Sequence, residues 1–117
     1  MSNFKELGVF WDAHRLTLEV YRICRGFPPI ERYGLAAQMR RAAGSIPTNL
    51  AEGSGRSTPA DFARFVDVAS GSLHELEYQI MLAHDLGYLS GGQYTDIDGR
   101  VSAVGRQLNG LRRALRR

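Results

Sequence analysis

A seven-residue apolar repeat within residues 59–86 is the feature that most constrains the fold of this chain. Its members alternate spacings of three and four residues, as the buried face of an α-helix does: Phe62, Val66, Ala69, Leu73, Leu76, Ile80 and Ala83. Thr58 can cap this helix, Pro59 fits its first position and Asp61 suits the positive end of its dipole. Gly87 is the expected residue after its last turn. A helix with so narrow an apolar seam has to pack against other helices.

Three further segments carry apolar residues at helical spacing. They cover about residues 9–27, 31–53 and 93–115, and no segment shows a convincing strand pattern. The connections between the four segments are short, and short connections favour antiparallel neighbours. We therefore expect an all-α protein, an up-down-up-down antiparallel four-helix bundle, with residues 1–117 as one domain.

The second predicted helix contains a proline at position 47. Its apolar phase continues on both sides of the proline: Met39, Ala42, Ile46 and Leu50. The pattern predicts one helix kinked at Pro47, with the Ser45 or Asn49 side chain satisfying a backbone group that the proline frees. Ser45, Asn49 and Glu52 also share a polar stripe. We interpret that stripe first as a polar brace or subunit contact, and second as a ligand site.

Positive charge is concentrated towards the two ends of the sequence. The chain carries a net charge of +3, made of +3 over residues 1–56, −6 over residues 57–98 and +6 over residues 99–117. All basic residues except Lys5 are arginine, the side chain suited to bidentate contacts with phosphate and carboxylate. These arginines could meet nucleic acid or the acidic middle of another copy.

Arg40, Arg41 and Arg56 are our first candidates for phosphate contacts. Arg40 and Arg41 are adjacent, so they point about 100° apart on a helix and cannot both face the core. Arg56 lies in the glycine-rich stretch EGSGRSTP, which we interpret as a helix connection in preference to a mononucleotide site. The second choices are Arg22, Arg25, Arg112 and Arg113. Cations near a helix carboxyl end also stabilise the helix dipole, which accounts for one or two of the C-terminal arginines.

The sequence gives little reason to expect an enzyme or a metal-binding protein. His74 and Glu77 reverse the order of the Glu-x-x-His motif of di-iron bundles and occur only once, so we expect no metal and no cofactor. Cys24 is the only cysteine, which excludes an intrachain disulfide and favours a cytoplasmic location. No residues assemble a nucleophile, a base and an oxyanion donor, so we expect no enzyme. No apolar run reaches the roughly 18 residues that span a bilayer, so we expect no membrane partner.

Two successive stretches of the sequence resemble a known family. They are FPPIERYGLAAQMRRAAGSIPTNLAEGSGR and FARFVDVASGSLHELEYQIMLAHDLGYLS. They fit the patterns YGL..Q.RRA..SIP.N.AEG.GR and F..F...A.GSL.ELE. The chain therefore closely resembles the bacterial four-helix-bundle family of 23S ribosomal RNA intervening-sequence proteins, from about Phe10 to the last helix. The resemblance implies a homopentamer without catalytic activity. Related accessory variability determinant proteins of diversity-generating retroelements form basic pentamers that bind nucleic acid and a reverse transcriptase.

Two functions follow as expectations. The first is a non-enzymatic, homo-oligomeric protein that binds RNA or DNA through its arginines. Apolar residues off the main stripe of the first predicted helix favour self-association: Phe10, Trp11, Leu18 and Tyr21. The second is a protein-interaction scaffold, in which the arginines serve subunit contacts or dock a reverse transcriptase or another protein.

Overall fold

Four long α-helices make up most of the protein. The structure is a computed structural model that describes residues 3–117. Its elements are η1 (Phe4–Glu6), α1 (Gly8–Cys24), η2 (Pro29–Glu31), α2 (Leu35–Ser54), α3 (Pro59–Asp85) and α4 (Gly91–Leu115), where η denotes a short 3₁₀ helix. These described residues contain no strand, which confirms the all-α prediction. Met1 and Ser2, the first two residues of the predicted domain, lie outside the described residues.

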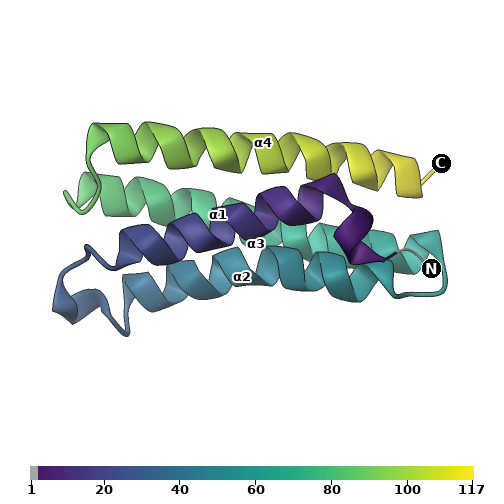
Figure 1. Cartoon of the computed structure of the whole chain (residues 1–117), viewed down its shortest axis with the longest axis horizontal. Helices are drawn as coiled ribbons and strands as arrows, with labels where there is room; N and C mark the ends of the chain where they lie inside the picture. The colour runs from purple at the N-terminus through teal and green to yellow at the C-terminus, as the bar shows by residue number, and fades with distance from the viewer. Residues whose placement is uncertain (1–2) are drawn as a thin grey trace.

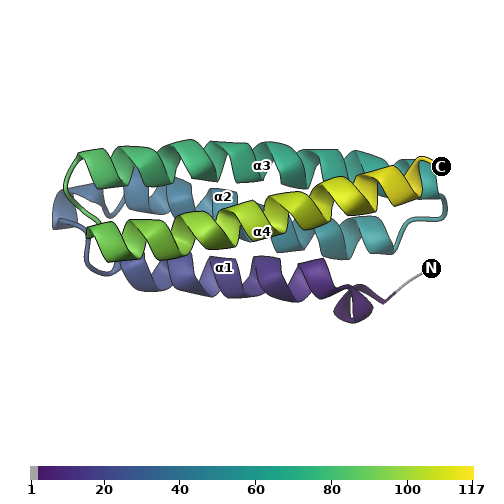
Figure 2. The same ribbon diagram turned by 90° about the horizontal axis from the view of Figure 1, so that it is seen from above.

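The helices lie side by side along one axis, in a body of 44 × 24 × 20 Å. Each helix runs opposite to the one before it (Figures 1 and 2). The α1–α2 and α3–α4 connections lie at one end, called here the loop end. The α2–α3 connection, the first described residues and the carboxyl end of α4 lie at the other, called here the terminal end (Figure 1). Within residues 3–117, none of the helices is both long and apolar enough to cross a membrane.

One apolar core runs between the four helices. Each helix contributes a fully buried side chain, such as Leu16, Met39, Leu76 and Leu108, each with 0% of its surface exposed. All seven members of the α3 repeat are buried, so the stripe read from the sequence is the one that packs inward. Burial of this kind supplies most of the stability of a helix bundle, at roughly 25 cal/mol per Å² of apolar surface.

The carboxyl end of α1 was predicted three residues too late. The helix ends at Cys24, and residues 25–27 form a turn in which the amide of Phe27 donates to the carbonyl of Cys24 at 3.1 Å. Pro28 disfavours the helical conformation in the residue before it, so the last turn tightens early. The turn places Phe27 in the core, where its ring lies 5.2 Å from that of Tyr88.

The amino end of α2 was predicted four residues too early. Residues 29–31 form η2, and α2 begins at Leu35. The reason is the Glu31 side chain, whose Oε1 accepts from the amide of Leu35 at 3.1 Å, while its Oε2 accepts from the Tyr88 hydroxyl at 2.9 Å. Glu31 therefore caps α2 from outside and ties the two connections of the loop end together.

The α3 and α4 boundaries follow local capping signals. The Thr58 hydroxyl accepts from the amide of Asp61 at 3.1 Å, as predicted, and α3 ends at Asp85, one residue before the expected end. Gly87 has a φ of +82°, its amide donates to the carbonyl of His84, and the amide of Tyr88 donates to the carbonyl of Ala83. Helix α4 begins at Gly91, two residues before the predicted start, because Ser90 and Gln93 form a capping box.

Helix α2 continues through Pro47 without interruption. A proline there lacks the amide that would donate to the carbonyl of Ala43. The prediction that Ser45 or Asn49 satisfies the freed group is wrong, because the Thr17 hydroxyl of α1 lies 3.1 Å from that carbonyl and donates to it. A neighbouring helix, and not α2 itself, compensates for the proline.

Candidate nucleic-acid interface

Arg40 and Arg41 diverge as their helical positions require. Arg40 is half-buried on the α1 side of α2, with its guanidinium 5.9 Å from the ring centroid of Tyr21. Arg41 is exposed and lines a shallow hollow between α2 and α3, beside Ser72 and Glu75. The two side chains therefore lie on two different faces of the bundle.

A larger hollow of about 490 Å³ lies at the loop end, between α1, η2 and α2. We call it the arginine hollow, because Arg25, Arg32 and Arg40 line it. No carboxylate oxygen of residues 3–117 lies within 4.0 Å of these three guanidinium groups. The hollow therefore gathers three positive charges that form no ion pair with a carboxylate of residues 3–117.

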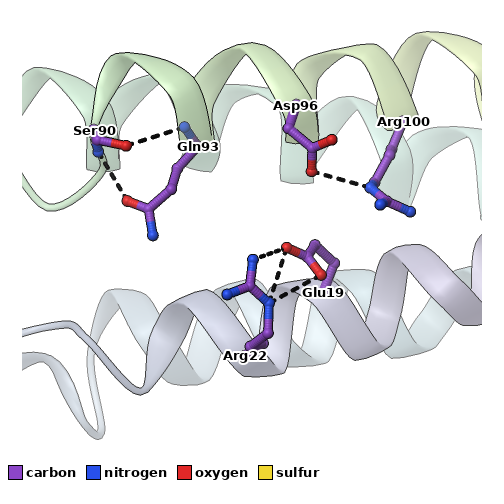
Figure 3. A network of polar contacts seen from close by, with 6 residues as sticks. All are labelled: Glu19, Arg22, Ser90, Gln93, Asp96 and Arg100. Carbon is purple, nitrogen blue, oxygen red and sulfur yellow. Dashed lines mark hydrogen bonds and ion pairs between the residues drawn. The ribbon is translucent and has the colours of Figure 1, made fainter.

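Arg22, a second-choice candidate, is held by an ion pair. Its guanidinium folds back onto Glu19 one turn earlier, and Figure 3 shows this pair opposite the Asp96–Arg100 pair of α4. The hydrogen bond from Arg22 holds the pKa of Glu19 below its ordinary value. Arg22 is therefore less available to a phosphate than the three arginines of the hollow.

Arg56 lies at the terminal end, far from Arg40. Sixteen residues separate them in sequence, which is about 24 Å at 1.5 Å per helical residue. Its guanidinium sits 4.6 Å from the ring centroid of Phe65 and 3.8 Å from a carboxylate oxygen of Asp61. Stacking and a carboxylate hold Arg56 against the start of α3, so it does not form one site with Arg40 and Arg41.

The C-terminal arginines divide into paired and unpaired groups. Arg112 and Arg116 contact the two carboxylate oxygens of Asp67 on α3, at 2.9 and 2.5 Å. The hydrogen bond from Arg116 is the largest of the effects that lower the pKa of Asp67. These contacts make Arg112 a structural residue that fastens α4 to α3. Arg113 is exposed, with no ion-pair partner among the described residues.

One residue of the predicted polar stripe, Ser45, links α2 to α3. The Ser45 and Ser72 hydroxyls are 2.8 Å apart, and the Asn49 amide donates to the Ser45 hydroxyl at 3.0 Å and to the Ser45 carbonyl at 2.7 Å. Pro47 is buried beside them, whereas Glu52 is exposed. These bonds favour the brace over a ligand site for Ser45 and Asn49.

The residues considered for chemistry stand apart from one another. Cys24 is buried, and burial raises the pKa of its thiol to about 11. Nδ1 of His74 contacts the carbonyl of Ser70 at 2.8 Å within the same helix. Within residues 3–117, no three side chains of the kinds that bind metals come together.

Apolar side chains remain exposed along one line of α1. Trp11, Leu18 and Tyr21 have 38%, 56% and 47% of their surface exposed, and they follow one another at spacings of seven and three residues. We call this line the α1 stripe. Tyr21 ends it at the wall of the arginine hollow.

Sequence reasoning missed Arg32 as a site residue. It stands between the proline pair and α2, and only the observed turn brings it next to Arg25 and Arg40. A partial signal was present, because Pro28 and Pro29 predict a break in the helix between Arg25 and Arg32. Tyr21 was expected to serve self-association alone.

The comparisons with known proteins agree with this fold. A family model described as 23S rRNA-intervening sequence protein matches residues 5–110. The chain therefore belongs to the 23S rRNA-intervening sequence protein family, which confirms the resemblance seen in the sequence.

A solved structure is similar to this chain over most of its length. It is a protein with unknown function from the S23 ribosomal protein family of Bacteroides thetaiotaomicron VPI-5482, which is 20% identical, with a TM-score of 0.80. The similarity covers 89% of this chain and 97% of that one, and it supports the four-helix fold. No curated protein matches the chain.

Proposed function

We propose that this chain is a non-enzymatic, homo-oligomeric nucleic-acid-binding protein of the cytoplasm, with RNA as its preferred polymer. Its unit is an up-down-up-down antiparallel bundle that contacts phosphates through arginine side chains. Binding of this kind is poorly sequence-specific and depends strongly on salt.

The observation that carries this proposal is the uncompensated charge at the loop end. Arg25, Arg32 and Arg40 share one hollow, and no carboxylate neutralises them within the described part of the chain. A guanidinium presents a fork of donors that matches two phosphate oxygens, and it stays charged at any physiological pH. Arg41 extends the positive surface to the adjoining face of α2.

Self-association strengthens such binding. The α1 stripe offers apolar surface for contact with a second copy, and we propose a ring of five copies, as the sequence resemblance implies. A ring repeats one weak phosphate contact around its axis, and the linked contacts multiply the affinity. We further propose that Pro47 bends α2 and thereby sets the face that meets a neighbouring subunit, near Glu52.

The test is a comparison of variants on a structured RNA. Wild-type protein at about 50 mM salt should bind the RNA, and Arg40→Ala/Arg41→Ala should bind it more weakly. Arg112→Ala, which removes an arginine already paired with Asp67, is the matched control and should change binding least. No binding by the wild type would overturn the proposal, and a double variant that binds as well as the wild type would overturn the choice of residues.

A second function has an observation of its own. Glu75 and Glu77 are exposed on α3 and have no ion-pair partner among residues 3–117, so they could receive arginines from another copy or from a partner such as a reverse transcriptase. The protein would then be an interaction scaffold. Assembly that weakens when Glu75 and Glu77 become glutamine, without RNA binding, would favour this alternative.

A further inference from the structure

The arginine hollow has the size of a site for one small ligand. Its volume of about 490 Å³ falls within the roughly 300–1,000 Å³ of typical ligand sites. Cys24, Phe27 and Ala36 are its buried members, and Pro28 and Pro29 form part of its wall. An extended polymer lies along an open surface, whereas the end of a strand can enter a recess.

Two of the three arginines of this hollow, Arg32 and Arg40, make contacts within the chain before any ligand binds. Nη2 of Arg40 donates to the carbonyl of Arg32 at 3.1 Å, which uses only one of its five N–H groups. The Arg32 guanidinium lies 5.5 Å from the ring centroid of the exposed Tyr33. Because these contacts restrict the side chains, less conformational entropy is lost when a ligand binds.

The acids nearest in sequence are directed elsewhere. Both carboxylate oxygens of Glu31 accept hydrogen bonds, from the Leu35 amide and the Tyr88 hydroxyl. Glu19 is paired with Arg22. The hollow therefore presents positive charge that these neighbouring acids do not neutralise, and it suits an anion carrying more than one negative charge.

A phosphate monoester meets this requirement better than a carboxylate or an internal phosphate of a nucleic-acid strand does. It carries about −1.5 to −2 charges at pH 7, against about −1 for a carboxylate or for an internal phosphate of a strand. Tyr21 stands at the wall with 47% of its surface exposed, and its ring can stack with a nucleobase. The arginine charges match a phosphate and the exposed Tyr21 ring matches a base, and a nucleotide carries both groups.

We propose that the arginine hollow binds a nucleoside monophosphate group, with the phosphate on Arg25, Arg32 and Arg40 and the base on Tyr21. The inference rests on the proposed function, because the terminal phosphate of an RNA strand is the source of this group that such a protein would meet. A free mononucleotide has the same chemistry, and the test separates the two.

The test uses full-length protein and one short single-stranded RNA in three forms, with a phosphate at the 5′ end, at the 3′ end or at neither. Wild-type protein should bind one phosphorylated form at least roughly tenfold more tightly than the unphosphorylated form. Arg25→Ala/Arg32→Ala should lose this preference. Arg41→Ala/Arg113→Ala, which removes the same charge outside the hollow, should weaken all forms alike and keep the preference. Adenosine monophosphate should compete for the phosphorylated form.

Each outcome decides between the two proposals. Equal binding of the three RNA forms by the wild type overturns the hollow as a phosphate site and leaves general RNA binding in place. A preference that survives Arg25→Ala/Arg32→Ala also overturns it. Binding of adenosine monophosphate without binding of any RNA supports the hollow and overturns the proposed function. Circular dichroism of both double variants checks that the exposed arginines were not needed for folding.

Discussion

The Thr17 hydroxyl of α1 donates to the carbonyl of Ala43 in α2, across 3.1 Å. The same oxygen lies 2.8 Å from the carbonyl of Ala13, so its one hydrogen is shared between two acceptors. Ala43 is the residue whose carbonyl loses its helical donor at Pro47. A hydrogen bond between two helices thus compensates for a defect inside one of them.

Replacing Thr17 with valine should destabilise the protein by about 1 kcal/mol, because a buried carbonyl loses its donor. In a Pro47→Ala background the same change should cost less, since the new amide at position 47 can donate to Ala43. Urea unfolding of the four proteins at one fixed concentration gives the coupling energy. Thr48→Val, on the exposed side of α2, should stay within about 0.5 kcal/mol of wild type. An equal cost in both backgrounds would contradict this account.

Alanine at Gly53 should destabilise the packing of α2 against α3. A Cβ there would lie 2.7 Å from Cβ of Phe65 and 2.8 Å from Cδ1 of Phe62, which is closer than packed atoms allow. Overpacking of this kind costs about 1–3 kcal/mol. Gly99→Ala in α4 is the matched control, because its Cβ would meet nothing within 4 Å, and it should stabilise the helix by up to about 1 kcal/mol. Thermal unfolding should show a lower melting temperature than wild type for Gly53→Ala and a higher one for Gly99→Ala.

Asp67→Asn should remove a pH-dependent part of the stability. The folded-state pKa of Asp67 is lowered by hydrogen bonding from Arg116 and by the nearby Arg112, so the charged form is stabilised on folding. This contribution is present above the unfolded pKa of about 3.9 and is lost as the pH falls through the lower folded value. With Asp67 partly exposed, we expect at most about 1 kcal/mol.

Urea unfolding at pH 7 and at successively lower pH tests this prediction. The difference in unfolding free energy between wild type and Asp67→Asn should be largest at pH 7, should begin to shrink as the pH approaches about 4, and should vanish only once the pH lies below the lowered folded pKa of Asp67. Glu75→Gln, which removes a carboxylate without an ion-pair partner in the described residues, should show no such difference. A difference that stays constant with pH would mean that the Asp67 charge is not what the substitution removes.

Leu18→Glu should weaken self-association, because it places a charge in the middle of the α1 stripe. Leu18 and Val68 have 56% and 53% of their surface exposed, so Val68→Glu on α3 is a matched control that lies outside the stripe. Light scattering should show a smaller particle for Leu18→Glu and the wild-type size for Val68→Glu. A monomeric wild type, or two variants that behave alike, would rule out the α1 stripe as the subunit interface.

The apolar repeats predicted the helices but not the interactions that end them. The buried face of α3 could be read from its own residues, because a repeat of this kind depends only on local spacing. The start of α2 could not, since Glu31, whose side chain caps that helix, takes its second partner from Tyr88, 57 residues away.

The candidate site was also only partly predictable from the sequence. Helical geometry alone separates Arg40 from Arg41. The grouping of Arg25 and Arg32 with Arg40 depends on the turn after α1, which the apolar spacing assigned to the helix, and so the apolar spacing alone did not predict the hollow.

The central claim is that uncompensated arginines bind RNA phosphates, and the salt dependence of RNA affinity tests it most directly. The logarithm of the association constant should fall linearly with the logarithm of the salt concentration. Arg25→Ala/Arg40→Ala should show a shallower slope, by about 0.7 to 0.9 for each phosphate that the variant no longer neutralises, whereas Arg112→Ala should keep the wild-type slope. An affinity that does not change with salt, or a slope unaffected by the Arg25→Ala/Arg40→Ala pair, would contradict the account.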